Sequence, residues 1–145
     1  MEDVMDKEKL RELSKEKPVQ AMVEIDQVIH PEYFDKSTPL VCLTFGQSGL
    51  EIADVKPIVN KKGQIIELIT YPDIKRVELF SVPKFHGLVT DTEGIKDNLL
   101  IKIELKNGEI LDFETEAMNL APVLEDRLPE LHIQVADRLD DDYEQ

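Results

Sequence analysis

Three histidines and one cysteine are the residues of this chain best suited to metal binding, acid–base catalysis or nucleophilic attack. His30, His86 and His132 lie far apart in the sequence, and Cys42 stands alone. Zinc ligands usually come in short spacings such as CxxC or HExxH, and neither spacing occurs. The sequence therefore predicts no metal site, and we interpret His30 and His86 as solvated loop residues.

Cys42 lies inside the apolar run of residues 40–43, which predicts a buried side chain rather than a reactive thiolate. A catalytic thiolate needs an activating base beside it, and the sequence offers none. A single cysteine also permits no internal disulfide, so nothing indicates an oxidising compartment.

Carboxylates are abundant, with 31 Asp and Glu in 145 residues, and their pattern is that of solvent-facing strand positions. Five of them are predicted to point outward: Glu51, Glu67, Glu78, Glu104 and Glu114. The acidic run 140–142 with Glu144 lacks the alternating ligands and the glycine of a calcium loop, so it is predicted to be a solvated tail. No phosphate-binding glycine loop or nucleophile motif occurs. We therefore expect that the protein is not an enzyme, that it has no catalytic, cofactor-binding or metal-binding residues, and that it uses no cofactor. The residues that bind a partner stay unknown at this point.

The formal net charge of −14 bears most strongly on the class of partner. Nucleic acids and anionic membrane surfaces attract cationic patches, and the most basic stretches are only the pairs Lys61-Lys62 and Lys75-Arg76. The sequence thus predicts no nucleic-acid partner and makes a membrane partner unlikely. It begins without a signal-peptide pattern and contains no apolar run long enough to span a bilayer, so a cytoplasmic location is the expectation.

Period-two alternation and turn residues predict about seven strands. Their expected ranges are 19–29, 40–45, 50–55, 65–69, 74–82, 99–105 and 110–113. Turns are expected at 46–49 and at 60–63, where glycine accompanies polar residues. The strictest alternation is that of Leu99, Ile101, Ile103 and Leu105. Asn107-Gly108 follows it and predicts a hairpin with a type I′ turn, since that turn needs positive φ at both central residues.

Helical spacing replaces this alternation near both ends of the chain. Residues 3–17 predict a short helix that is either exposed or docked through Leu10 and Leu13, and that is stopped by Pro18. The amphipathic stretch 117–131 predicts a short helix over roughly residues 119–128, in which Pro122 occupies the first turn. Leu131, Val135 and Leu139 are expected to continue as a second helical piece. We divide the chain into a helical arm (1–18), one β-rich domain with its capping helix (19–131) and an acidic tail (132–145).

The order of elements from 40 to 131 resembles a bacterial pleckstrin-homology-like domain. Three stretches carry this resemblance: residues 71–78, where Pro72 and a short turn lead into Ile74-x-x-Val77; the hairpin 99–113; and the amphipathic stretch 117–131. The resemblance implies a mainly β fold, with a partly open antiparallel barrel, a C-terminal capping helix and a short N-terminal helix. The basic loop that lipid-binding members use is replaced by Gln47, Ser48 and Gly49.

These observations favour a non-enzymatic protein-interaction or accessory module, because a partly open barrel leaves a strand edge at which a peptide can pair. Self-association into a homo-oligomer by the same route stays open. Two alternatives remain: a peripheral membrane or lipid sensor, which follows from the resemblance, and a small-ligand-binding domain using the mouth of the barrel.

Overall fold

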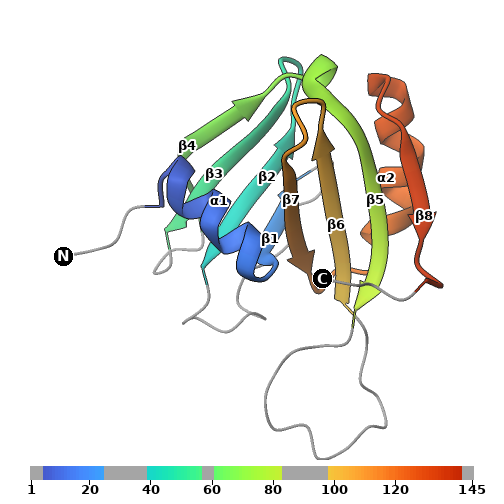
Figure 1. Ribbon diagram of the computed structural model, residues 1–145, viewed down its shortest axis with the longest axis horizontal. Coiled ribbons are helices and arrows are strands. Elements are labelled where there is room, and N and C mark those ends of the chain that lie inside the picture. Colours follow the sequence, from blue (N-terminus) through green and yellow to red (C-terminus); the bar gives the residue numbers. More distant parts are fainter. Residues whose placement is uncertain (1–4, 25–38, 57–60, 83–97, 142–145) are drawn as a thin grey trace, which may run out of the picture.

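One sheet of eight strands, flanked by two α-helices, makes up most of the structure (Figure 1). The structure is a computed structural model and describes residues 5–24, 39–56, 61–82 and 98–141. In chain order the elements are α1 (Lys7–Glu16), β1 (Val19–Glu24), β2 (Leu40–Phe45), β3 (Leu50–Lys56), β4 (Lys61–Ile69), β5 (Ile74–Val82), β6 (Asn98–Leu105), β7 (Ile110–Thr115), α2 (Leu120–Arg127) and β8 (Val135–Arg138). The strands lie side by side in the order β4-β3-β2-β1-β7-β6-β5-β8, so the sheet is not closed.

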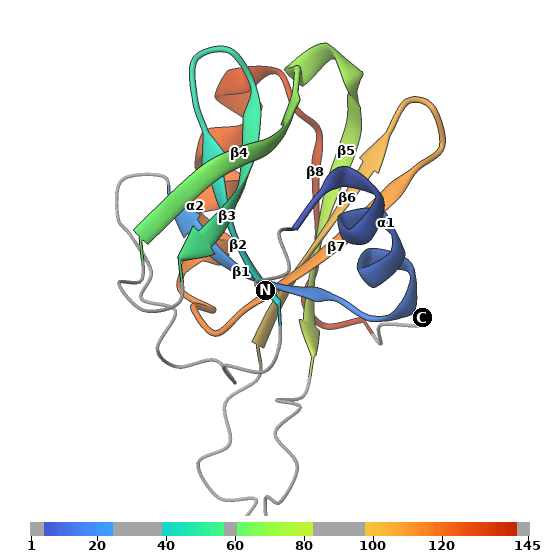
Figure 2. The same cartoon turned by 90° about the vertical axis from the view of Figure 1, so that its left-hand side faces the viewer.

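The sheet consists of two antiparallel meanders joined at its centre. Strands β2, β3 and β4 form one meander and β5, β6 and β7 form the other. Strand β1 connects them because it pairs in parallel with both β2 and β7 (Figure 2). The predicted mainly β, open architecture with helical caps is therefore confirmed. The sheet has eight strands rather than about seven, and it is mixed, since β8 also runs parallel to β5.

The main hydrophobic core lies on one side of the sheet, as period-two alternation requires. On β6 the predicted residues Leu99, Ile101, Ile103 and Leu105 all face it. Leu10 of α1 and three residues of α2 also pack into this core, and the two helices lie far apart in both views (Figures 1 and 2). Burying a side chain such as Leu10 contributes about 1.5–3 kcal/mol, so both predicted helices dock by their apolar faces.

The β6–β7 hairpin is confirmed, but its turn is not type I′. Gly108 has φ +95°, whereas among the described residues His132 is the one non-glycine with positive φ, so Asn107 cannot supply the second positive φ. Instead the amide of Gly108 donates to the carbonyl of Leu105 and the amide of Leu105 donates to that of Glu109. The loop is therefore one residue longer, and the side chain of Asn107 accepts a hydrogen bond from the amide of Glu109.

Strand β4 begins earlier than expected. The predicted turn at 60–63 is wrong for its last three residues, because they already belong to β4, where Lys61 and Lys62 pair with β3. Asn60 lies outside the described residues. The β3–β4 pairing contains register shifts beside Ala53, and the side chain of Asp54 accepts a hydrogen bond from the amide of Gln64 there. Such a bulge changes which residues of a strand face the core.

The C-terminal part departs most from the prediction. Helix α2 and the 3₁₀ turn Leu128–Leu131 confirm the predicted helix, with Pro122 in its first turn. The second helical piece is wrong, because Val135–Arg138 form strand β8 on the edge of β5. His132 adopts a left-handed conformation (φ 63°), and its amide donates to the carbonyls of Leu128 and Pro129, which ends the helical path.

The predicted acidic tail 132–145 therefore contributes a strand to the sheet, while residues 142–145 lie outside the described part. The division of the chain at residues 18 and 131 stays a prediction. Within the described ranges, no helix has the length and apolarity that crossing a membrane would require.

Candidate functional site

Of the four residues with catalytic potential, the structure describes Cys42 and His132, and these two lie on different elements. His30 and His86 lie outside the described residues, and His132 is exposed in the turn before β8. Cys42 is buried on β2, with its Sγ 3.8 Å from Oγ1 of Thr44, as predicted for a packed side chain. Among the described residues no group of His, Cys, Asp and Glu is arranged to hold a metal ion.

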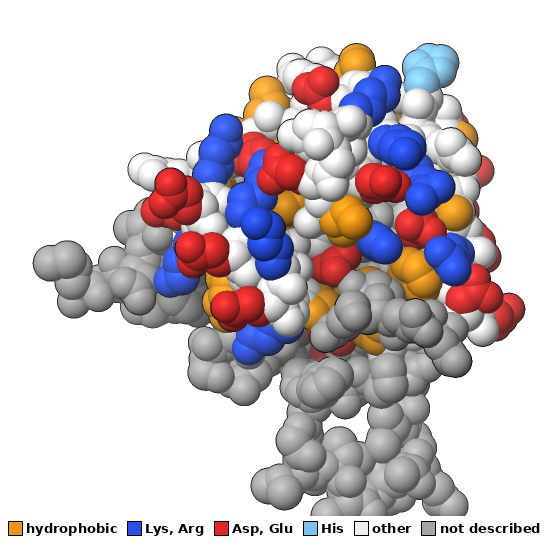
Figure 3. Space-filling model, viewed as in Figure 1, with side chains coloured by type: hydrophobic (Ala, Val, Ile, Leu, Met, Phe, Trp, Pro, Cys, Tyr) orange, Lys and Arg blue, Asp and Glu red, His pale blue; other side chains and the backbone are white. Residues whose placement is uncertain are grey.

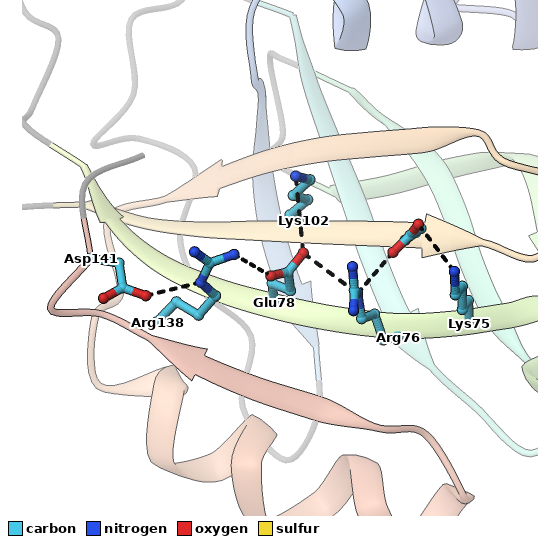
Figure 4. A network of polar contacts seen from close by, with 7 residues as sticks. Lys75, Arg76, Glu78, Lys102, Arg138 and Asp141 are labelled. Carbon is cyan, nitrogen blue, oxygen red and sulfur yellow. Dashed lines mark hydrogen bonds and ion pairs between the residues drawn. The ribbon is translucent and has the colours of Figure 1, made fainter. Parts of the chain in front are cut away.

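One polar network lies on the outer side of β5, β6 and β8 (Figure 4). Its centre is Glu78, which is only 4% exposed although it points away from the main core. Nη1 of Arg138 lies 2.8 Å from Oε2 of Glu78, and Nζ of Lys102 lies 3.9 Å from Oε1. Nε of Arg76 lies 3.7 Å from the same Oε1. A carboxylate so enclosed needs its cations, because an unpaired buried charge costs several kcal/mol.

The same network fastens β8 to the sheet. The guanidinium of Arg138 also reaches Asp141, with Nε 2.9 Å from Oδ2, and stacks over the ring of Phe80 at 5.1 Å. Hydrogen bonds to Glu78 and then to Asp141 raise the pKa of Arg138. The basic pair Lys75-Arg76 is likewise paired, with both side chains on Glu104. The network thus holds an edge strand in place and leaves these cations engaged with carboxylates.

A second polar cluster joins helix α1 to two distant parts of the sheet. Arg11 donates to Glu67 on β4 and to Glu109 at the tip of the β6–β7 hairpin. Asp6 caps the helix by accepting from the amide of Lys9 at 2.8 Å, and Ser14 accepts from the amide of Asp112 at 2.7 Å. These contacts fix α1 to β7, to the tip of the β6–β7 hairpin and to β4, so the helix links the two meanders.

The charges of this cluster stabilise one another. Burial lowers the pKa of Arg11, but its hydrogen bonds to Glu67 and Glu109 outweigh that effect and raise it. The hydrogen bond from Arg11 in turn lowers the pKa of Glu109. A hollow of about 270 Å³ lies beside the cluster, lined by Arg11, Glu67 and Asp73 among others.

The prediction that Glu67 points outward is wrong. It pairs with the core residue Ile52 and is 7% exposed, because the bulge places both Ile66 and Glu67 on the core side of β4. Glu51, Glu78, Glu104 and Glu114 do lie on the outer side, although Glu78 and Glu114 are buried there. Oε1 of Glu114 accepts a hydrogen bond of 2.9 Å from the side-chain Nδ2 of Asn98.

Removing the Arg11 side chain should loosen α1. We expect Arg11→Ala to lower the free energy of unfolding by about 1–3 kcal/mol, since Glu67 would keep a buried charge without its cation. Urea unfolding measures this loss, and hydrogen exchange should show it concentrated in α1. Lys7→Ala on the exposed side of the same helix is the control and should change stability by less than about 0.5 kcal/mol.

This prediction also has a pH dependence. Because the folded-state pKa of Glu109 is lowered, its contribution to stability is present above the unfolded pKa and is lost as the pH falls through the folded pKa. The difference in stability between wild type and Arg11→Ala should therefore shrink on acidification below pH of about 4. An unchanged difference at low pH would contradict the ion pairing.

The most exposed large apolar side chains of the described residues lie on β4. Ile65 is 54% exposed and Leu68 is 48% exposed, and both lie on the outer side of the strand. Strand β4 is one edge of the sheet, with nine residues and no strand beyond it among the described residues. The other edge, β8, has four residues and is covered with charge. Residues 65–69 form the apolar half of this edge strand, and an exposed apolar edge of this kind readily pairs with another chain.

Sequence reasoning did not single out these residues. The signal was present in the doublets Ile65-Ile66 and Leu68-Ile69, which supply more apolar residues than one face of a strand can bury. On the face that carries α1, basic and acidic side chains are interspersed, and neither sign forms a large patch among the coloured residues (Figure 3).

Comparison of the chain with protein-family models, with curated proteins and with solved structures finds no significant match to any of them.

Proposed function

We propose that this protein is a non-enzymatic interaction module that binds an extended segment of a partner protein along strand β4. The observation that carries the proposal is the edge itself: a nine-residue strand that has no neighbour on its outer edge within the described ranges and that exposes Ile65 and Leu68. A partner strand would gain backbone hydrogen bonds from this edge and would bury both side chains. Proteins usually protect such edges with charge, as β8 does here. On β4 the lysine pair Lys61-Lys62 stands at the start of the strand, and Glu67 is the one charged residue within the apolar segment 65–69.

The resemblance to pleckstrin-homology-like domains stays a hypothesis. The open sheet and the helix that follows the β6–β7 hairpin support it. The parallel pairing of β1 and of β8 departs from the antiparallel barrel that the resemblance implies. For lipid binding, the described contacts of Lys75, Arg76, Lys102 and Arg138 count against an anion site, because carboxylates already occupy these cations. The β4 edge therefore supports a protein partner better than a membrane surface.

Leu68→Lys tests the proposal with little risk to the fold. Because Leu68 is half-exposed, the substitution should change stability by less than about 0.5 kcal/mol. Peptides selected from a random display library on the wild type should shift the NMR signals of residues 65–69, and Leu68→Lys should abolish their binding.

Ile110→Lys is the matched control, since Ile110 is 43% exposed on β7 and lies away from the β4 edge. It should leave peptide binding unchanged. Peptides that map to another surface, or that bind Leu68→Lys as well as wild type, would rule out β4 as the binding edge.

A further inference from the structure

The outer side of the sheet beside β4 has two rows of different chemistry, which follow from the strand register. One row crosses the sheet from Leu68 on β4 to Glu51 on β3, Thr44 on β2 and Glu24 on β1. In this row Oγ1 of Thr44 donates to Oε2 of Glu24 at 3.0 Å. The residue of this row nearest to a bound partner is therefore apolar, and the next one, on β3, is a carboxylate.

The neighbouring row is apolar along its whole length. It runs from Ile65 on β4 to Ala53 on β3, Cys42 on β2 and Met22 on β1. Ala53, Cys42 and Met22 form a small buried cluster of their own, and Ile65 is the exposed end of the row. A residue placed beside Ile65 thus meets no charge within its own row.

From these rows we infer that the segment bound at β4 is basic, with a lysine or arginine opposite Leu68 and an apolar residue opposite Ile65. This inference rests on the proposed function. Adjacent strands lie about 4.8 Å apart, so a partner strand would lie roughly 10 Å from β3. A lysine or arginine there can lay its aliphatic stem over Leu68 and direct its charge toward Glu51.

The overall charge favours the same partner. At −14 the protein attracts cationic segments over a distance and repels a second copy of itself. The carboxylates Glu51 and Asp73 lie beside the end of β4 that carries Leu68. A basic extended segment therefore fits this edge better than another copy of the chain does.

Three synthetic peptides test the inference. Each is as long as β4 and carries on one face a valine and, two residues further on, a variable residue that is lysine, glutamate or threonine. The other positions are the same in all three peptides, and each peptide is acetylated and amidated at its ends. We expect the lysine peptide to shift the amide signals of residues 67–69 and to bind at least about tenfold more tightly than the glutamate peptide. Its affinity should fall as salt is added.

Glu51→Gln tests whether Glu51 is the carboxylate that attracts the lysine side chain of the peptide. It should weaken binding of the lysine peptide by about three- to tenfold and leave the threonine peptide unaffected. Glu130→Gln is the matched control, because it removes the same charge from an exposed position in the 3₁₀ turn after α2. Equal effects of the two variants would mean that only net charge acts, and would overturn the assignment to Glu51.

The outcomes separate this inference from the function on which it rests. If the glutamate or threonine peptide shifts residues 67–69 as strongly as the lysine peptide, the basic partner is wrong and strand addition at β4 stands. If no peptide shifts them and the display library also selects nothing at β4, both fail. If these signals shift with protein concentration alone, a second copy occupies the edge and the inference is overturned.

Discussion

Gly49→Ala is expected to destabilise the fold by about 3–5 kcal/mol, a large part of the stability of a domain of this size. Gly49 ends the turn between β2 and β3 with φ +152°, a conformation that side-chain-bearing residues rarely adopt. A Cβ at this position would lie 2.4 Å from the carbonyl oxygen of Ile69 and 3.1 Å from Cα of Thr70. Both neighbours are backbone atoms, so the end of β4 would have to move away from β3.

Equilibrium unfolding in urea measures this loss, and Gly108→Ala is the matched control. Gly108 also has positive φ, at +95°, but an added Cβ would meet nothing within 4 Å. Gly108→Ala should therefore cost only the backbone strain, about 1–2 kcal/mol. If the two variants lose equal stability, the close approach of β3 to β4 is not what requires glycine at position 49.

Phe113→Ala should cost about 3–5 kcal/mol through a different cause, the cavity left in the centre of the sheet. Phe113 is fully buried on β7, where it pairs with Val19 of β1 on one side and Ile101 of β6 on the other. It therefore packs where the two meanders meet, and only Gln20 and Glu114 form a second pair between β1 and β7.

Two measurements check this prediction. Urea unfolding should show the loss in stability, and hydrogen exchange should show that the amides of β1 lose protection first. Phe45→Ala is the control, because Phe45 is only partly buried at the end of β2 and should cost about half as much or less. A uniform loss of protection across all strands would contradict a special role of Phe113 at the junction.

The parts of the fold that the sequence predicts correctly are those encoded by contacts between near neighbours. Strands β2 and β5 have the predicted bounds, and the β6–β7 hairpin follows from the alternation of residues 99–105. Pairing between strands far apart in the chain leaves no such local pattern. For that reason the parallel contacts of β1 with β2 and β7 could not be predicted from alternation.

Two errors have local physical causes. Leu131, Val135 and Leu139 have helical spacing, but the left-handed backbone of His132 turns the chain before the second of them. On β4 the bulge shifts the alternation by one residue, so Glu67 faces the core and pairs with Arg11. The candidate site depends on the same shift, because it places Ile65 and Leu68 together on the outer side.

The narrow junction between β1 and β7 also bears on the rate at which the molecule folds. Each meander pairs segments that are neighbours in the chain order, so each can form early with a small loss of chain entropy. The pairing of Val19 with Phe113 instead brings together two segments that are far apart in the chain. Since such distant contacts form slowly, refolding should have a late step in which two preformed halves dock along β1.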